Sequence, residues 1–92
     1  MSIKIVIPLV LQHFTNRLES VEVKGSSLGE CLSSLTKQFP GMEKALFIRN
    51  GALHHDVGIY VSGKDAYAEG LAKPVEDGDD IIIVFGGPGA HP

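Results

Sequence analysis

Isoleucine alternates with polar or smaller residues at the start of the chain. Ile3, Ile5 and Ile7 share one parity, which predicts a half-buried strand. Pro8 lacks an N–H donor, so we expect this strand to end near residues 9–11. After a polar stretch, residues 12–17, a second alternating segment contains Leu18, Val21 and Val23 and closes at Gly25. These two segments predict a pair of strands that form a hairpin.

A helical repeat follows the second strand. Its apolar positions lie three and four residues apart: Leu28, Cys31, Leu32, Leu35 and Phe39. Ser27 and Glu30 have the spacing of a capping box, so we expect the helix to begin at Leu28. Pro40 disfavours a helical residue before it, and Gly41 accepts a left-handed conformation. The sequence therefore predicts that the helix ends there, with Phe39 and the other apolar side chains along one face.

The second half of the chain reads as short strands and turns. Residues 42–48 predict a helical turn, and Asn50-Gly51 predicts a reversal. Alternation over residues 57–61 predicts a strand, and residues 71–75 read as an extended segment. Asp77-Gly78-Asp79 predicts a tight turn. The apolar run from Ile81 to Phe85 is typical of a strand in the middle of a sheet.

This order of elements predicts an α+β fold in which one main helix packs on a mixed sheet of four to five strands. Ninety-two residues leave room for one domain with a modest core. We assign residues 1–85 to that domain. Residues 86–92 contain three glycines and two prolines, so we expect them to form a flexible tail that projects from it.

Composition narrows the function classes. The net charge of −3 argues against nucleic acid or an anionic membrane as a partner. Hydrophobic residues make up 43% of the chain, but no apolar run approaches the length of a membrane span, and residues 1–11 lack the features of a signal peptide. The single Cys31 cannot form an internal disulfide or supply a metal site alone. We expect a cytoplasmic protein without a bound metal or cofactor.

Four segments resemble the MoaD/ThiS family of ubiquitin-like sulfur carrier proteins, which includes the small subunit of molybdopterin synthase. They are VIPLVLQHFT, VEVKGSSLGECLSSLTKQFPGM, IYVSGKDAY and KPVEDGDDIIIVF, and together they span most of the chain. The resemblance implies a β-grasp fold. It also implies a carrier that acts as a substrate of other enzymes and is not an enzyme itself.

In that family the C-terminal glycine is adenylated with ATP by an E1-like enzyme and converted to a thiocarboxylate. The thiocarboxylate then donates its sulfur in cofactor biosynthesis of the molybdopterin or thiamine type, or in amino-acid biosynthesis. The partners implied are the E1-like adenylating enzyme and a sulfur-accepting synthase subunit. Glycine suits the tail because a main chain without Cβ atoms can enter a narrow active site.

The tail departs from the family pattern because five residues follow Gly86-Gly87. If Gly87 carries the sulfur, the tail reaches only about 7 Å beyond Phe85. If the family diglycine corresponds to Gly89-Ala90, the reach is about 17 Å. Either alternative implies removal of tail residues, for instance by a metallopeptidase. We expect Phe85, Gly86, Gly87, Pro88 and Gly89 to contact the partners.

A second hypothesis is a ubiquitin-like binding or regulatory subunit that docks on an enzyme without carrying sulfur. Glu76, Asp77, Asp79 and Asp80 would then, at the base of the tail, orient the domain on a basic partner, or they would only cap a turn. His54, His55 and Asp56 read as a solvated loop rather than a metal site. Cys31 reads as a core residue rather than a reactive thiol.

Overall fold

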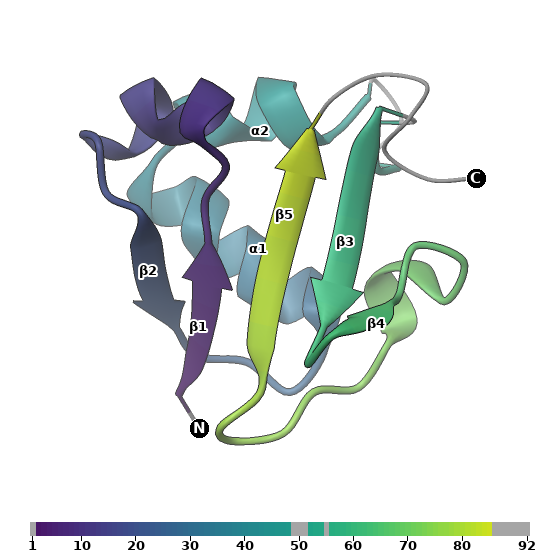
Figure 1. Ribbon diagram of the computed structural model, residues 1–92. Coiled ribbons are helices and arrows are strands. Elements are labelled where there is room, and N and C mark those ends of the chain that lie inside the picture. Colours follow the sequence, from purple (N-terminus) through teal and green to yellow (C-terminus); the bar gives the residue numbers. More distant parts are fainter. Residues whose placement is uncertain (1, 49–51, 55, 86–92) are drawn as a thin grey trace.

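The computed structural model describes residues 2–48, 52–54 and 56–85 and contains one five-stranded sheet in the order β2-β1-β5-β3-β4. The strands are β1 (Ile3–Val6), β2 (Ser20–Val23), β3 (Val57–Val61), β4 (Lys64–Asp65) and β5 (Asp80–Phe85). The helices α1 (Leu28–Gln38) and α2 (Gly41–Leu46) lie behind the sheet as Figure 1 shows it. This is the predicted α+β arrangement, a β-grasp fold.

The first and last strands lie side by side and run in the same direction. β1 and β5 are parallel, with Ile5 opposite Ile81, whereas β2 and β3 pair with their neighbours in antiparallel fashion. β5 is therefore the middle strand of the sheet, as the continuous apolar run predicted. Because β1 and β5 end at the same edge of the sheet, the C-terminal end of β5 lies beside the segment that follows β1 (Figure 1).

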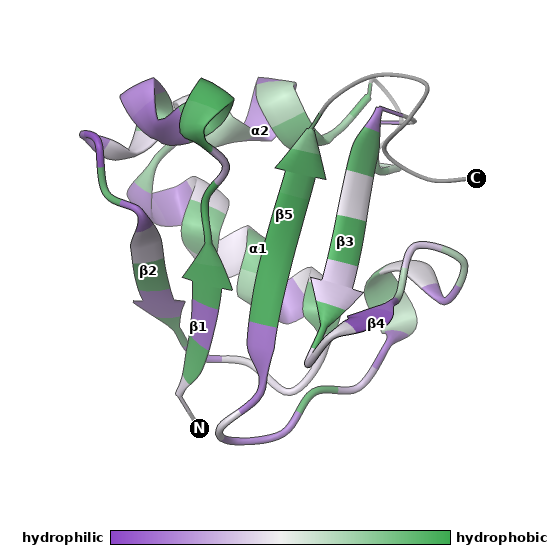
Figure 2. Ribbon diagram, viewed as in Figure 1, coloured by the Kyte–Doolittle hydropathy of each residue, from purple (hydrophilic) through white to green (hydrophobic). Residues whose placement is uncertain are grey.

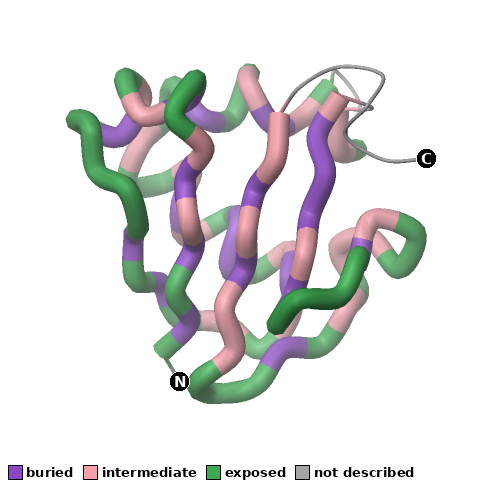
Figure 3. Tube along the Cα trace, viewed as in Figure 1, coloured by how far each residue is buried: buried purple, intermediate pink, exposed green. Residues whose placement is uncertain are grey.

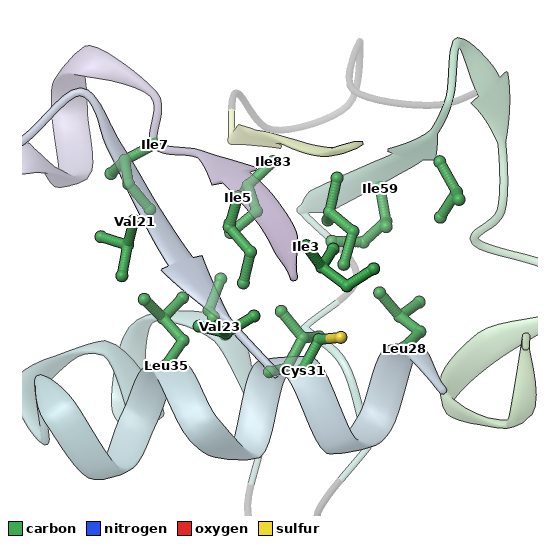
Figure 4. Packing of buried hydrophobic residues seen from close by; sticks show 14 of the residues in the cluster. Ile3, Ile5, Ile7, Val21, Val23, Leu28, Cys31, Leu35, Ile59 and Ile83 are labelled. Atoms are coloured by element: carbon green, nitrogen blue, oxygen red, sulfur yellow. The ribbon is translucent and has the colours of Figure 1, made fainter. Parts of the chain in front are cut away.

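The core lies between the sheet and α1. Every apolar helix residue from Leu28 to Leu35 is fully buried, including Cys31, and Phe39 packs at its margin. These helix side chains pack against the inward-facing residues of the strands, which occupy every second position and include Ile5, Ile59 and Ile83 (Figure 4). Figure 3 shows this burial as purple segments along the three central strands. The predicted period of two in the strands and of three to four in the helix is confirmed.

A capping box contains two reciprocal hydrogen bonds, and α1 forms only one of them as predicted. The Ser27 Oγ accepts a hydrogen bond from the Glu30 N–H at 3.2 Å, and the helix begins at Leu28. The reciprocal bond is different, because the Glu30 carboxylate accepts from the N–H and hydroxyl of Ser26 instead of from Ser27. These bonds hold the pKa of Glu30 below its usual value.

Gly41 does not adopt the left-handed conformation that we expected. It opens α2, and Pro40 precedes it as the N-terminal cap. Glycine is required here because a larger residue does not fit: a Cβ at this position would lie 2.7 Å from Cδ1 of Phe14. α2 buries Met42 and Leu46, so the helical turn predicted over residues 42–48 is confirmed in position and slightly shorter.

Two connecting segments were predicted wrongly. The stretch between β1 and β2 forms the 3-10 helix η1 (Leu9–Thr15), whose Leu11 and Thr15 are buried, while Leu18 is exposed. The strand β1 accordingly ends at Val6. Residues 71–75 are not continuously extended, because a second 3-10 turn, η2 (Gly70–Ala72), precedes an isolated bridge between Pro74 and Ser27. The Asn50-Gly51 turn lies outside the described residues.

Leu32→Ala tests how far the core depends on α1. Leu32 is fully buried, so truncation removes apolar contacts and leaves a cavity, and we expect the free energy of unfolding to fall by about 2–5 kcal/mol. Urea denaturation monitored by circular dichroism measures the change. Ser33→Ala, on the exposed side of the same helix, is the matched control and should change it by less than about 0.5 kcal/mol. An equal effect of both substitutions would contradict this packing.

Candidate functional site

The tail follows directly after Phe85, the last residue of β5. Phe85 is the last described residue, and it lies opposite Val57 where β3 begins. The predicted site residues Gly86, Gly87, Pro88, Gly89 and Ala90 lie outside the described residues, so their roles stay predictions. What the structure establishes is the surroundings from which the tail leaves: α2, η1 and the segment before β3 lie at this end of the sheet (Figure 1).

Phe85 is half-buried at the edge of the core and is contacted by an aromatic neighbour. The imidazole of His54 meets the Phe85 ring nearly edge-on, with ring centroids 6.0 Å apart and an interplanar angle of 68°. The Tyr67 hydroxyl donates to the His54 carbonyl at 3.4 Å. His54 thus lies in a loop, as we had expected, but its ring is half-buried against Phe85 at the base of the tail rather than fully solvated.

The outer face of the sheet, opposite the helices, carries an apolar patch. Along the three central strands, the outward-facing parity includes four partly exposed side chains that are apolar or aromatic. We define them as the outer patch: Val6, Tyr60, Ile82 and Val84. Ile82 lies between Val6 on β1 and Tyr60 on β3, so the patch is a continuous row across the sheet. In Figure 2 the apolar colour runs along the upper parts of β1 and β5.

Two further apolar residues are exposed near the end of β5. Leu9 and Val10 begin η1, and 81% and 56% of their surface is accessible. Pro8 ends the β ladder just before them. Isolated exposed apolar residues are ordinary, but here two successive ones begin η1, which lies at the edge of the sheet where β5 ends (Figure 1). We had placed Leu9 and Val10 in the end of a strand, so this surface was missed.

The acidic turn is at the other end of the sheet. Glu76, Asp77 and Asp79 precede β5, whereas the tail follows it, so the expected position at the base of the tail is wrong. The alternative reading, a turn that caps local donors, is confirmed for the Glu76 N–H, and the carboxylates also bind two distant donors. Asp77 Oδ1 accepts from the Ser2 N–H at 2.7 Å, and Asp79 accepts from the Glu76 N–H and the Ser62 hydroxyl.

Other candidate groups do not form a reactive centre. The Cys31 thiol is fully buried, and burial raises its pKa, which disfavours the thiolate. No group of three potential metal ligands occurs among the residues that the structure describes; His55 is outside them.

An open groove of about 720 Å³, lined in part by Gly29, Phe47 and Leu71, lies on the helical side of the molecule. Across residues 2–48, 52–54 and 56–85, no helix combines the length and apolar character needed to cross a membrane.

Comparison with known proteins identifies relatives across nearly the whole chain. The sulfur carrier protein CysO of Mycobacterium tuberculosis is 33% identical over 87 residues, which cover 91% of this chain and 94% of CysO. The same figures hold for CysO of Mycobacterium bovis. The comparison with protein-family models gave no match.

Solved structures agree with these relatives. In the crystal structure of the Amycolatopsis orientalis BexX/CysO complex, the matching chain is 28% identical, with a TM-score of 0.86 over 95% of this chain and 98% of that one. Mycobacterium tuberculosis CysO gives a TM-score of 0.83 at 32% identity, over 90% of this chain and 97% of that one. The small archaeal modifier protein 1 from Haloferax volcanii, at 20% identity and a TM-score of 0.84, shares the fold over 97% and 99% of the two chains.

The acidic turn generates a prediction about pH. Hydrogen bonds from the Glu76 N–H and then the Ser62 hydroxyl hold the pKa of Asp79 below its usual value. A carboxyl group with a lowered folded-state pKa stabilises the fold above its unfolded pKa of about 3.9, and this stabilisation is lost as the pH falls through the folded value. We therefore expect Asp79→Asn to lose less stability than the original chain between about pH 5 and pH 3.

Thermal unfolding followed over this pH range measures the effect. The matched control is Glu43→Gln, which removes an exposed carboxylate from α2 and should leave the pH dependence close to that of the original chain. A pH profile that Asp79→Asn does not flatten would contradict the role of these hydrogen bonds.

Proposed function

The chain belongs to the family of ubiquitin-like sulfur carriers that includes CysO and is related to MoaD and ThiS, and we propose that it carries sulfur as a C-terminal thiocarboxylate. It is a carrier like its relatives and not a catalyst. The observation that carries the proposal is the 33% identity with CysO over 87 residues. The position of β5 agrees with it, since the central strand leads directly into the glycine-rich tail.

The chemistry requires little from the carrier beyond its terminus. A carboxylate is a poor electrophile, so its oxygen first attacks the α-phosphorus of ATP and releases pyrophosphate, on an E1-like enzyme. A sulfur nucleophile then displaces AMP from the acyl-adenylate, and the carbon keeps the sulfur as a thiocarboxylate. The catalytic groups belong to the enzyme. ATP is accordingly a substrate of the partner and not a cofactor of this chain.

The acceptor that we propose is a synthase of amino-acid biosynthesis, with cysteine as the first product to test. The relatives at 33% identity are CysO proteins, and this favours the amino-acid branch over the molybdopterin branch that the family resemblance also implied. Removal of residues after Gly87 or Ala90, by a metallopeptidase or another peptidase, precedes adenylation in this proposal, because the chain continues to Pro92.

The outer patch is the surface that we propose for docking on the adenylating enzyme. Its row of Val6, Ile82 and Tyr60 reaches across three strands, and Ile82 and Val84 lie on β5, the strand from which the chain continues into the tail. An apolar patch on the strand that leads into the reactive segment lets the same enzyme hold the domain and receive the tail. The CysO of Amycolatopsis orientalis was crystallised in a complex with BexX.

The intact mass of the protein from its native cells tests the carrier proposal first. We expect a species that ends at Gly87, Gly89 or Ala90, and a fraction of it heavier by the difference between one sulfur and one oxygen atom. The mass also decides which of these three termini is used. A chain that always extends to Pro92, even when sulfur demand is high, would overturn the proposal and favour a binding subunit that carries no sulfur.

Ile82→Asp tests the docking surface. A charge in the middle of the outer patch must be desolvated on binding, so we expect the affinity for the adenylating enzyme to fall at least about tenfold. Isothermal titration calorimetry measures the affinity, and circular dichroism confirms the fold. Ser33→Asp is the matched control, because it adds the same charge on the exposed side of α1, away from the outer face of the sheet. Equal affinities of the two variants would exclude the outer patch as the docking surface.

A further inference from the structure

Phe85 ends the described part of β5 opposite Val57, at a ladder position where the two residues exchange no backbone hydrogen bonds. The Ser62 N–H donates to the Asp80 carbonyl at 2.9 Å, and bonded and non-bonded pairs alternate along antiparallel strands from that point. The pair of Val57 and Phe85, five residues on, therefore falls at a non-bonded position. On the other side, the described pairing of β5 with β1 ends at Ile82. Side-chain contacts therefore contribute to the position of this last described residue.

The imidazole of His54 supplies such a contact. Its ring meets Phe85 at a centroid distance of 6.0 Å and an angle of 68°, an edge-to-face arrangement that aromatic pairs prefer. Both side chains are half-buried. The contact is formed at the residue directly before Gly86, which is where the glycine-rich tail begins.

His54 is itself held firmly by its neighbours. Its N–H donates to the Leu46 carbonyl at 2.7 Å, and its carbonyl accepts from the Val57 N–H at 3.0 Å and from the Tyr67 hydroxyl. The ring nitrogen Nδ1 accepts a hydrogen bond from the Asp56 N–H at 3.1 Å. The backbone of His54 thus joins α2 to β3, while its side chain is oriented by the next turn of the chain.

We propose that His54 is a positioning residue, whose imidazole holds the Phe85 ring and thereby fixes the point and direction from which the tail leaves the sheet. The inference rests on the proposed function, because a fixed exit matters for a tail that must deliver its terminus to an active site. A group held in the reactive geometry reacts faster, whereas docking through the outer patch is a separate contribution to affinity. His54 does not touch the reacting atoms.

Two substitutions separate the ring from its hydrogen bond. His54→Asn keeps an acceptor near the position of Nδ1 for the Asp56 N–H, but it removes the ring edge that meets Phe85. His54→Phe keeps an aromatic ring and loses the acceptor. If the ring contact with Phe85 is what matters, His54→Asn should be impaired and His54→Phe should be close to the original chain.

Amide hydrogen exchange on the full chain tests the contact directly. We expect the Val84 amide, in the last bonded pair of β5 with Gly58, to exchange about five- to tenfold faster in His54→Asn, because local opening of the strand end becomes easier, while the Ile83 amide in the core keeps its rate. His54→Phe should restore the original rate within about twofold. Unchanged exchange at Val84 in His54→Asn, or impairment in His54→Phe alone, would overturn the inference.

Adenylation kinetics test the positioning role, with the E1-like enzyme, ATP and the chain shortened to the terminus that the intact mass identifies, followed by pyrophosphate release. We expect His54→Asn in this shortened chain to lower kcat about tenfold and to leave KM within about twofold, with rescue by His54→Phe. An unchanged kcat beside faster Val84 exchange would overturn positioning. If the shortened chain with His54 is not adenylated, the proposed function fails, and the exchange comparison alone still decides whether His54 holds Phe85.

Discussion

The parallel pairing of β1 with β5 is the constraint on which the other features of this molecule depend. It brings the first and last strands together in the middle of the sheet, so β5 has neighbours on both sides and buries Ile81 and Ile83 against the helical layer. A terminal strand in such a position resists fraying, because it cannot leave without opening the core. A tail that follows it therefore starts from a fixed point.

The same pairing determines what surrounds that point. Parallel strands end at the same edge, so the segment after β1, which includes η1 with the exposed Leu9 and Val10, lies at the edge of the sheet where β5 ends (Figure 1). Side chains along β5 point alternately to the two faces of the sheet. Ile81 and Ile83 pack inward, whereas Ile82 and Val84 form the outer patch together with Val6 and Tyr60. Affinity and delivery of the terminus can then be supplied by different surfaces of one small domain.

The local errors of prediction share one cause. Glycine at position 41 and the polar stretch before β2 were interpreted by local propensity, but tertiary contacts decided both: the Phe14 ring excludes a Cβ at Gly41, and burial of Leu11 and Thr15 winds η1. The acidic turn combines both cases. The bond from the Glu76 N–H to Asp79 is local and follows the expected turn chemistry, whereas Asp77 and Asp79 also accept from Ser2 and Ser62, which are distant in the chain. The place of the turn at the end of the sheet away from Phe85 follows from the direction of β5.

The sequence by itself determined the periodic elements: the strands around Ile3 and Val21, α1 from Leu28, the central β5, and the resemblance to sulfur carriers, because each rests on a repeat or motif contained in one continuous segment. It could not determine contacts between segments that are distant in the chain. His54 and Phe85 are separated by thirty residues that include two strands, and no local pattern marks them as partners. Only the tertiary structure brings them together, because the order of strands in the sheet, and not the order of residues, decides which side chains meet at the exit of the tail.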